Sequence, residues 1–274
     1  MPVITTSDGT KLHVKDWGHG RPVVLIHGWP LNADSWEYQS VALAEAGFRV
    51  ISYDRRGFGR SDQPWDGYDY DTLADDLAAV IEGLGLKDVT LVGFSMGGGE
   101  VARYMTRHGG GVSQAVFVGS VVPGMLKSDS NPHGITRDLL EGIQAGLRKD
   151  RPTFLADFFK QFYGQGLVGG VSQEILDWTL GMAMMASPRA TLECVTAFGT
   201  TDFSGDVPHI NVPTLIIHGT SDKTVPIETT ARRLAPMLPD ARLIEYSGAP
   251  HGLTATHADR LVSDLLEFLR DAGS

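Results

Sequence analysis

The chain has 274 residues, 42% hydrophobic and 20% charged, which is typical of a soluble globular protein with one large or two small α/β domains. Its 23 basic and 33 acidic residues give a formal net charge of −10, which argues against nucleic acid or an anionic membrane as partner. A single cysteine, Cys194, excludes an internal disulfide. With no secretory signal and no apolar run long enough to span a bilayer, this predicts a cytoplasmic protein.

Short apolar runs alternate with helical patterns over most of the chain. The predicted strands cover residues 3–6, 10–17, 22–26, 48–53, 89–94, 112–121, 213–218 and 241–246. The predicted helices between and after them cover residues 35–46, 71–84, 98–107, 228–238 and 257–271. The first two strands are expected to form a hairpin, and the later alternation predicts a doubly wound, mostly parallel sheet of the α/β class.

The alternation stops between residues 123 and 205, where helical patterns follow one another without a buried strand. These patterns cover residues 135–149, 152–163, 172–185 and 188–200. A helical block inserted between two strand–helix units predicts a lid over the carboxyl edge of the sheet. We therefore expect a core domain of residues 1–122 and 206–274, with residues 123–205 as an inserted helical lid.

Residues 93–97 read Gly-Phe-Ser-Met-Gly and lie between a predicted strand and a predicted helix. The pattern Gly-x-Ser-x-Gly is weak evidence alone in a chain with 33 glycines, but a strand before it and a helix after it indicate a nucleophile elbow. Gly93 and Gly97 would leave room for a serine in a strained backbone conformation. Ser95 is therefore the candidate nucleophile.

A serine nucleophile needs a base to take its proton and an acid to orient that base. Asp222 directly follows the predicted strand at 213–218, and His251 lies in a tight loop after the strand at 241–246. The carboxyl ends of parallel strands meet at one edge of the sheet, so we expect Ser95, Asp222 and His251 to converge there. Their order along the chain is also the order in α/β-hydrolases.

An oxyanion hole needs two backbone N–H donors. Met96 follows the nucleophile, and Trp29 lies in the loop His-Gly-Trp-Pro at 27–30, whereas Pro30 has no N–H to donate. His27 is interpreted as a histidine that fixes this loop by hydrogen bonds.

Other polar motifs are interpreted as structural. His218 is interpreted in the same way as His27, and the run Asp-Arg-Arg-Gly at 54–57 is expected to form a buried or half-buried ion-pair network that shapes the site. Cys194 lies in an apolar helical pattern, which favours buried packing over a reactive thiol. No histidine has the spacing from carboxylates that is expected of a zinc site, and the glycines at 97–99 serve the elbow, so we predict no metal and no dinucleotide.

Over nearly its whole length the sequence resembles the α/β-hydrolase family, and within it the small bacterial arylesterases and cofactor-free (non-heme) haloperoxidases, also called perhydrolases. The matching stretches are HGWP at 27–30, YDRRGFGRSDQPW at 53–65, GFSMGGGE at 93–100, TAFGTTDF at 196–203, HGTSDKTVP at 218–226 and APHG at 249–252. The resemblance implies Ser95, Asp222 and His251 as the catalytic triad, the N–H groups of Trp29 and Met96 as the oxyanion hole, and no cofactor.

The resemblance also implies a mainly apolar acyl pocket under the lid. The residues at positions that match this pocket are Phe94, Phe158, Phe162, Phe198 and Val225. For each of these aromatic residues, packing within the lid core is the alternative interpretation. Related members often carry larger aromatic residues at the positions of Met125, Ile143 and Ile227, so the preferred acyl chain stays open.

Pro30 also matches the pocket, because members with strong perhydrolysis tend to have proline after the oxyanion tryptophan. Proline restricts the residue before it, so it could aim the Trp29 carbonyl into the site. A carbonyl there would accept a hydrogen bond from hydrogen peroxide and favour peroxide over water.

The sequence thus predicts a serine hydrolase that cleaves small aryl or alkyl esters through an acyl-enzyme. With hydrogen peroxide as the second nucleophile, it would release a peracid that oxidises halide, which is the activity of a perhydrolase or non-heme chloroperoxidase. A lactonase or γ-lactamase is one alternative, and a non-catalytic ligand-binding protein of the same fold is another. The natural substrate and the oligomeric state stay open, although related proteins often form homo-oligomers.

Overall fold

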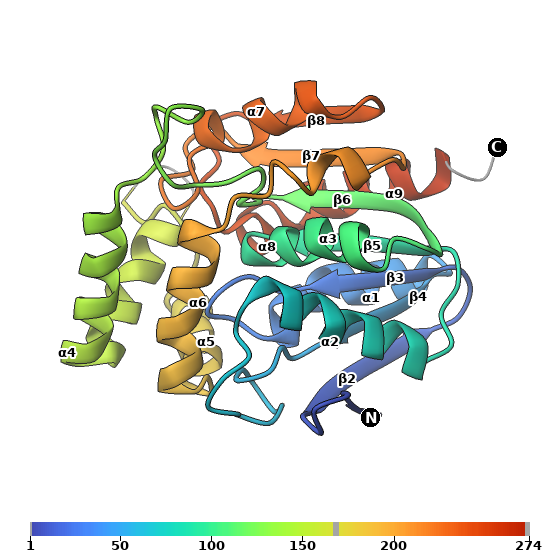
Figure 1. Ribbon diagram of the computed structural model, residues 1–274, viewed down its shortest axis with the longest axis horizontal. Coiled ribbons are helices and arrows are strands. Elements are labelled where there is room, and N and C mark those ends of the chain that lie inside the picture. Colours follow the sequence, from blue (N-terminus) through green and yellow to red (C-terminus); the bar gives the residue numbers. More distant parts are fainter. Residues whose placement is uncertain (1, 167–169, 272–274) are drawn as a thin grey trace.

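The computed structural model describes residues 2–166 and 170–271 and is drawn in Figure 1. Within these residues one eight-stranded sheet has the order β1-β2-β4-β3-β5-β6-β7-β8. The strands are β1 (Val3–Thr5), β2 (Lys11–Gly18), β3 (Pro22–Ile26), β4 (Arg49–Tyr53), β5 (Val89–Phe94), β6 (Val112–Val118), β7 (Thr214–Gly219) and β8 (Ala241–Tyr246). β2 pairs antiparallel with β1 and β4, and the pairs from β4 to β8 are parallel. The predicted mostly parallel sheet is confirmed.

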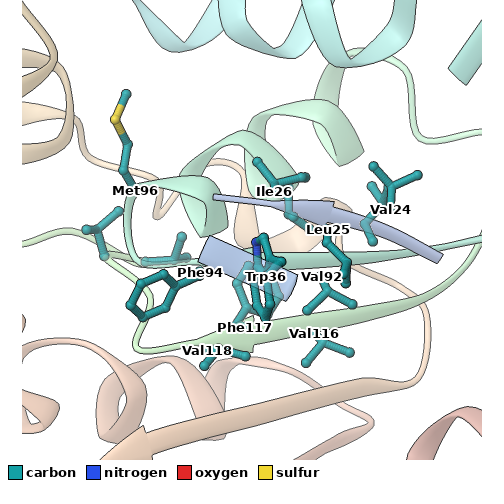
Figure 2. Packing of buried hydrophobic residues seen from close by; sticks show 14 of the residues in the cluster. Val24, Leu25, Ile26, Trp36, Val92, Phe94, Met96, Val116, Phe117 and Val118 are labelled. Carbon is teal, nitrogen blue, oxygen red and sulfur yellow. The ribbon is translucent and has the colours of Figure 1, made fainter. Parts of the chain in front are cut away.

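The central strands are apolar on both faces because helices cover both sides of the sheet. Every residue of β5 and of β7 is buried. Leu91 of β5 stands between Val24 of β3 and Ala115 of β6 in the parallel register. Figure 2 shows the side chains of these three strands packed together with Trp36, which is fully buried.

Two pairs of helices cover the faces of the sheet (Figure 1). α2 (Tyr70–Gly83) packs on α3 (Met96–Arg107) on the near face, and α1 (Glu37–Glu45) packs on α9 (Ala258–Asp271) on the far face. The Asp69 side chain caps α2 by accepting a hydrogen bond from the N–H of Thr72 at 3.0 Å. Leu73, Leu77, Val80 and Ile81 give α2 one buried apolar face.

Among the described residues, the α-helices between β6 and β7 are α4 (Arg137–Phe162), α5 (Gln173–Met184) and α6 (Pro188–Thr200). They lie together beyond the carboxyl ends of the strands, on the left in Figure 1. Two helices were expected within α4, and its backbone is indeed non-helical at Asp150 (φ −159°, ψ 85°), whose side chain caps the second half by accepting from the N–H of Thr153. The division into a core and a lid of residues 123–205 stays a prediction.

Some element boundaries were predicted wrongly. The single helix expected at 228–238 is instead two 3₁₀ turns, Ile227–Thr229 and Ala235–Met237, on either side of the short α7 (Ala231–Leu234). Pro236 lacks the N–H that a continuous helix requires. β6 ends at Val118 and not at residue 121, because Gly119 leaves the extended conformation with φ 52°. The short α8 (Leu253–Thr256), which precedes α9, was not predicted.

Candidate active site

Ser95 stands at the sharp turn between β5 and α3 and has φ 54° and ψ −118°, a conformation that is costly for a residue with a side chain. A Cβ atom at Gly93 would lie 2.5 Å from the carbonyl oxygen of Gly97, and a Cβ atom at Gly97 would lie 2.6 Å from the carbonyl oxygen of Ile26. Only glycine fits at either position, as the sequence suggested. The Ser95 side chain therefore projects from the start of a helix.

The structure brings Ser95, His251 and Asp222 together at the carboxyl edge of the sheet. The Nε2 atom of His251 lies 2.9 Å from Ser95 Oγ, and its Nδ1 atom lies 2.5 Å from Asp222 Oδ2. Asp222 follows β7 and His251 follows β8, and all three residues are buried. This geometry matches the expected convergence of the three side chains.

The surroundings of Asp222 keep its carboxyl group ionised. Oδ1 accepts hydrogen bonds from the N–H groups of Thr224 (2.9 Å) and Val225 (2.8 Å), and Oδ2 lies 3.3 Å from Nε2 of His218. Burial would raise the pKa of Asp222, but the imidazoles of His251 and His218 lower this pKa to about 2. An ionised carboxylate only accepts, so Nδ1 of His251 carries the proton and Nε2 is left to accept from the Ser95 hydroxyl.

Two aromatic rings hold the imidazole of His251 in place. Phe94 stacks on it with ring centroids 5.0 Å apart, and Phe162 meets it edge-on at 4.9 Å. These two residues were expected to line the acyl pocket, but neither is among the residues that line the cavity beside Ser95. Their contacts restrict the position of the base.

The loop at 27–30 passes directly beside Ser95, since a Cβ atom at Gly28 would lie 3.0 Å from Ser95 Cβ. Among the described residues, neither the N–H of Trp29 nor that of Met96 has a hydrogen-bond acceptor. Met96 is the first residue of α3, where free N–H groups and the positive end of the helix dipole favour an anion. The indole of Trp29 donates to the carbonyl of Thr191 on α6 at 3.0 Å.

A cavity of about 410 Å³ opens beside Ser95. Its lining is mainly apolar and comes from the loop at 27–30, the turn after β5, the segment after β6, α4, α6 and the loop after β7: Trp29, Ser95, Val121, Met125, Ile135, Leu139, Ile143, Phe154, Asp157, Phe158, Gln161, Phe198, Lys223, Thr224 and Val225. Phe158, Phe198 and Val225 are therefore placed where the sequence analysis expected them. Pro30 is buried but does not line the cavity.

The sequence analysis related Ile143 to the size of the acyl pocket but did not assign Ile135 or Leu139 to the aliphatic wall of this cavity. Ile135, Leu139 and Ile143 line it together. Leu139 and Ile143 share one face of α4 at a spacing of four residues, and Ile135 lies just before this helix. That spacing was available in the sequence and could have identified the wall.

The expected ion-pair network around residues 54–57 is present. Arg55 pairs with Glu100 and Arg56 pairs with Asp76, and all four side chains are buried. The sequence analysis named neither acidic partner, because Glu100 lies 45 residues from Arg55 on α3 and Asp76 lies 20 residues from Arg56 on α2. Within residues 2–166 and 170–271, no group of three or more histidine, cysteine or acidic side chains is arranged to hold a metal ion. In the same ranges, no helix combines the length and the apolar character needed to cross a membrane.

Comparison with known proteins places the chain in a family. Residues 21–167 match the model of the family described as alpha/beta hydrolase fold. A non-heme chloroperoxidase from Kitasatospora aureofaciens is 45% identical over 98% of this chain and 99% of its own length. A bifunctional esterase/perhydrolase from Acinetobacter calcoaceticus is 41% identical over 98% of this chain and 100% of its own length. The crystal structure of a bromoperoxidase from Bacillus anthracis is 46% identical, with a TM-score of 0.94 over 98% of this chain and 99% of that chain. The chain therefore belongs to the α/β-hydrolase family, and its relatives there include non-heme haloperoxidases and an esterase/perhydrolase, as its motifs predicted.

Proposed function

We propose that this protein is a carboxylic ester hydrolase that forms an acyl-enzyme on Ser95 and that also accepts hydrogen peroxide in place of water. One observation carries the proposal: the hydrogen-bonded chain from Ser95 Oγ through His251 to Asp222, beside a mainly apolar cavity. The relatives add support, because one is named a non-heme chloroperoxidase and another an esterase/perhydrolase.

In the first half-reaction, Ser95 Oγ attacks the acyl carbon of the ester while Nε2 of His251 takes the hydroxyl proton. Asp222 stabilises the imidazolium that forms. The N–H groups of Trp29 and Met96 donate to the oxyanion, and His251 returns the proton to the departing alcohol.

In the second half-reaction, His251 removes a proton from water and the carboxylic acid is released. With hydrogen peroxide instead, the acyl group is transferred to a peroxide oxygen and a peracid is released. The peracid then oxidises a halide ion by two electrons and is itself reduced to the carboxylic acid. Pro30 restricts Trp29, and we expect the Trp29 carbonyl to accept a hydrogen bond from the bound peroxide.

Hydrolysis of p-nitrophenyl esters by wild-type protein and by Ser95→Ala tests the proposal. We expect Ser95→Ala to lose about 10⁴-fold or more in kcat, because the nucleophile, base and acid act as a unit. Ser113→Ala is the matched control, since its hydroxyl donates to the carbonyl of Asp88 at the amino end of the sheet. Unchanged turnover by Ser95→Ala would remove the proposal.

Two further measurements separate the alternatives. A fluorophosphonate probe should label wild-type Ser95, whereas a ligand-binding protein without an activated serine should not react. A panel of aryl esters, a γ-lactone and a γ-lactam, each tested with and without hydrogen peroxide and bromide, compares ester, lactone and lactam opening with perhydrolysis. Faster opening of the lactone or lactam than of every ester would reassign the substrate class.

A further inference from the structure

A fully buried ion pair lies under the loop at 27–30. Nε of Arg55, just after β4, donates to Oε1 of Glu100 on α3 at 2.6 Å, and the hydroxyl of Tyr53 donates to Oε2 of Glu100 at 2.7 Å. Both charged side chains are 0% exposed. A buried pair of this kind gains little stability over apolar side chains of the same volume, because removing two charges from water is costly. The pair therefore calls for an explanation beyond stability.

Arg55 also fixes the position and the tautomer of His27. Its Nη2 donates to the carbonyl of His27 at 2.6 Å, and its backbone N–H donates to Nε2 of His27 at 3.0 Å. Burial, followed by the charge of Arg55, holds the pKa of His27 well below its usual range, so the ring is neutral. Since Nε2 accepts, the single ring proton is on Nδ1.

The Nδ1–H of His27 then donates to the carbonyl oxygen of Gly28 at 2.9 Å. The same oxygen accepts from the N–H of Leu31 at 3.0 Å. This carbonyl belongs to the peptide group whose N–H is that of Trp29, and a peptide group is planar. The two hydrogen bonds therefore set the direction of the Trp29 N–H, and they also polarise it, because a peptide that accepts at its oxygen donates more strongly at its nitrogen.

We infer that Glu100, Arg55 and His27 are positioning residues that aim and polarise the Trp29 N–H at the oxyanion. Glu100 lies on α3, the helix whose first residue, Met96, supplies the other donor, so the ion pair also connects the two halves of the oxyanion hole. The inference rests on the proposed ester hydrolase activity. It says that the N–H groups of Trp29 and Met96, which come from distant segments, keep their relative position through the buried pair of Arg55 and Glu100.

The neighbouring pair Arg56–Asp76 offers a matched control. Both of its side chains are 2% exposed, and two hydrogen bonds of 2.6 Å join them. Arg56 is adjacent to Arg55 in the chain but forms no hydrogen bond with the loop at 27–30 among the described residues. Arg56 also pairs with Asp8 at 2.8 Å, so Asp76→Asn leaves this arginine one carboxylate and should cost less stability than Glu100→Gln. Only Glu100→Gln should affect the oxyanion hole.

The test compares kcat, KM and the midpoint of thermal unfolding for wild type, Glu100→Gln and Asp76→Asn on p-nitrophenyl acetate. For Glu100→Gln we expect kcat to fall about 10- to 100-fold, with KM changed less than about threefold, because a misdirected donor weakens the transition state more than substrate binding. Affinity for an alkylboronic acid, whose tetrahedral adduct on Ser95 carries a negative oxygen, should fall by a similar factor. Asp76→Asn should keep kcat and the affinity for the boronic acid within about threefold of wild type.

Equal losses of kcat in Glu100→Gln and Asp76→Asn, or wild-type kcat in a folded Glu100→Gln, would overturn the inference. If Glu100→Gln does not fold, His27→Leu takes its place, since leucine has no side-chain donor for the Gly28 carbonyl and leaves the Arg55–Glu100 pair in the chain; wild-type kcat in that variant would overturn the inference equally. Failure of the proposed function is distinguishable, because wild-type protein would then neither hydrolyse the ester nor react with the fluorophosphonate.

Discussion

Replacing Gly93 with alanine tests how closely β5 and α3 approach at the elbow. The new Cβ atom would lie 2.5 Å from the oxygen of Gly97, 2.6 Å from its carbonyl carbon and 2.7 Å from Cα of Gly98. All three neighbours are backbone atoms, so no side chain can move aside. An ordinary contact of 3.4 Å requires the strand and the helix to separate by about 0.9 Å.

Overpacking costs about 1–3 kcal/mol, and a collision between backbones belongs at the upper end, about 3 kcal/mol. For a chain of this size, that loss lowers Tm by roughly 6–12 °C. The same separation displaces Ser95 from His251, and a displacement of about 1 Å can cost about 100-fold in turnover. Urea denaturation followed by circular dichroism measures the first effect, and ester hydrolysis at a temperature where the variant is folded measures the second.

Gly181→Ala is the control for this prediction. Gly181 lies inside α5, and no atom lies within 4 Å of the Cβ that alanine would add. Alanine is preferred to glycine inside a helix by about 1 kcal/mol, so this variant should be slightly more stable than wild type. A Gly93→Ala protein within about 0.5 kcal/mol of wild type would refute the argument that the elbow requires glycine.

Three other predictions concern pH, a thiol and the cavity. The carboxyl of Asp222 has a pKa of about 2 in the folded chain, against an ordinary value of 3.8. Its ionised form therefore stabilises the fold above pH 3.8, and this contribution is lost as the pH falls to 2. Urea denaturation between pH 4 and 2 should show about 2 kcal/mol of such loss in wild type that Asp222→Asn lacks, and equal pH dependence would contradict it. Burial raises the pKa of the Cys194 thiol to about 12, so Ellman's reagent should react only after unfolding, and rapid reaction in native buffer would show the thiol to be accessible. Ile143→Phe narrows the cavity, so kcat/KM for p-nitrophenyl octanoate should fall about 10-fold while that for the acetate is nearly unchanged; equal effects on both esters would place Ile143 outside the acyl site.

The alternation of strands and helices was sufficient to predict the sheet and the convergence of three side chains. Ser95, Asp222 and His251 each follow a parallel strand, and such positions meet at one edge whatever the details of packing. The catalytic roles of these residues stay proposals. The positions of Phe94 and Phe162 could not be predicted, because whether a ring faces the cavity or the imidazole depends on side-chain torsions and on where α4 lies.

The pairing of Arg55 with Glu100 was also beyond the sequence analysis. The two residues belong to different elements, and no periodicity relates them. Arg55 has several acidic residues within the same stretch of chain, and only the position of α3 decides which one it meets. Buried polar pairs between distant segments depend on the assembled fold, whereas apolar periodicity is a local signal.

The indole of Trp29 links the size of the acyl group to the position of the Trp29 backbone. Its hydrogen bond to Thr191 fastens the segment that would stabilise the transition state to a helix forming one wall of the cavity. An acyl group bulky enough to push that wall outward would drag the Trp29 backbone along with it. Esters with oversized acyl groups should therefore show a lower turnover number as well as weaker binding, because the position of α6 also sets the position of the Trp29 backbone.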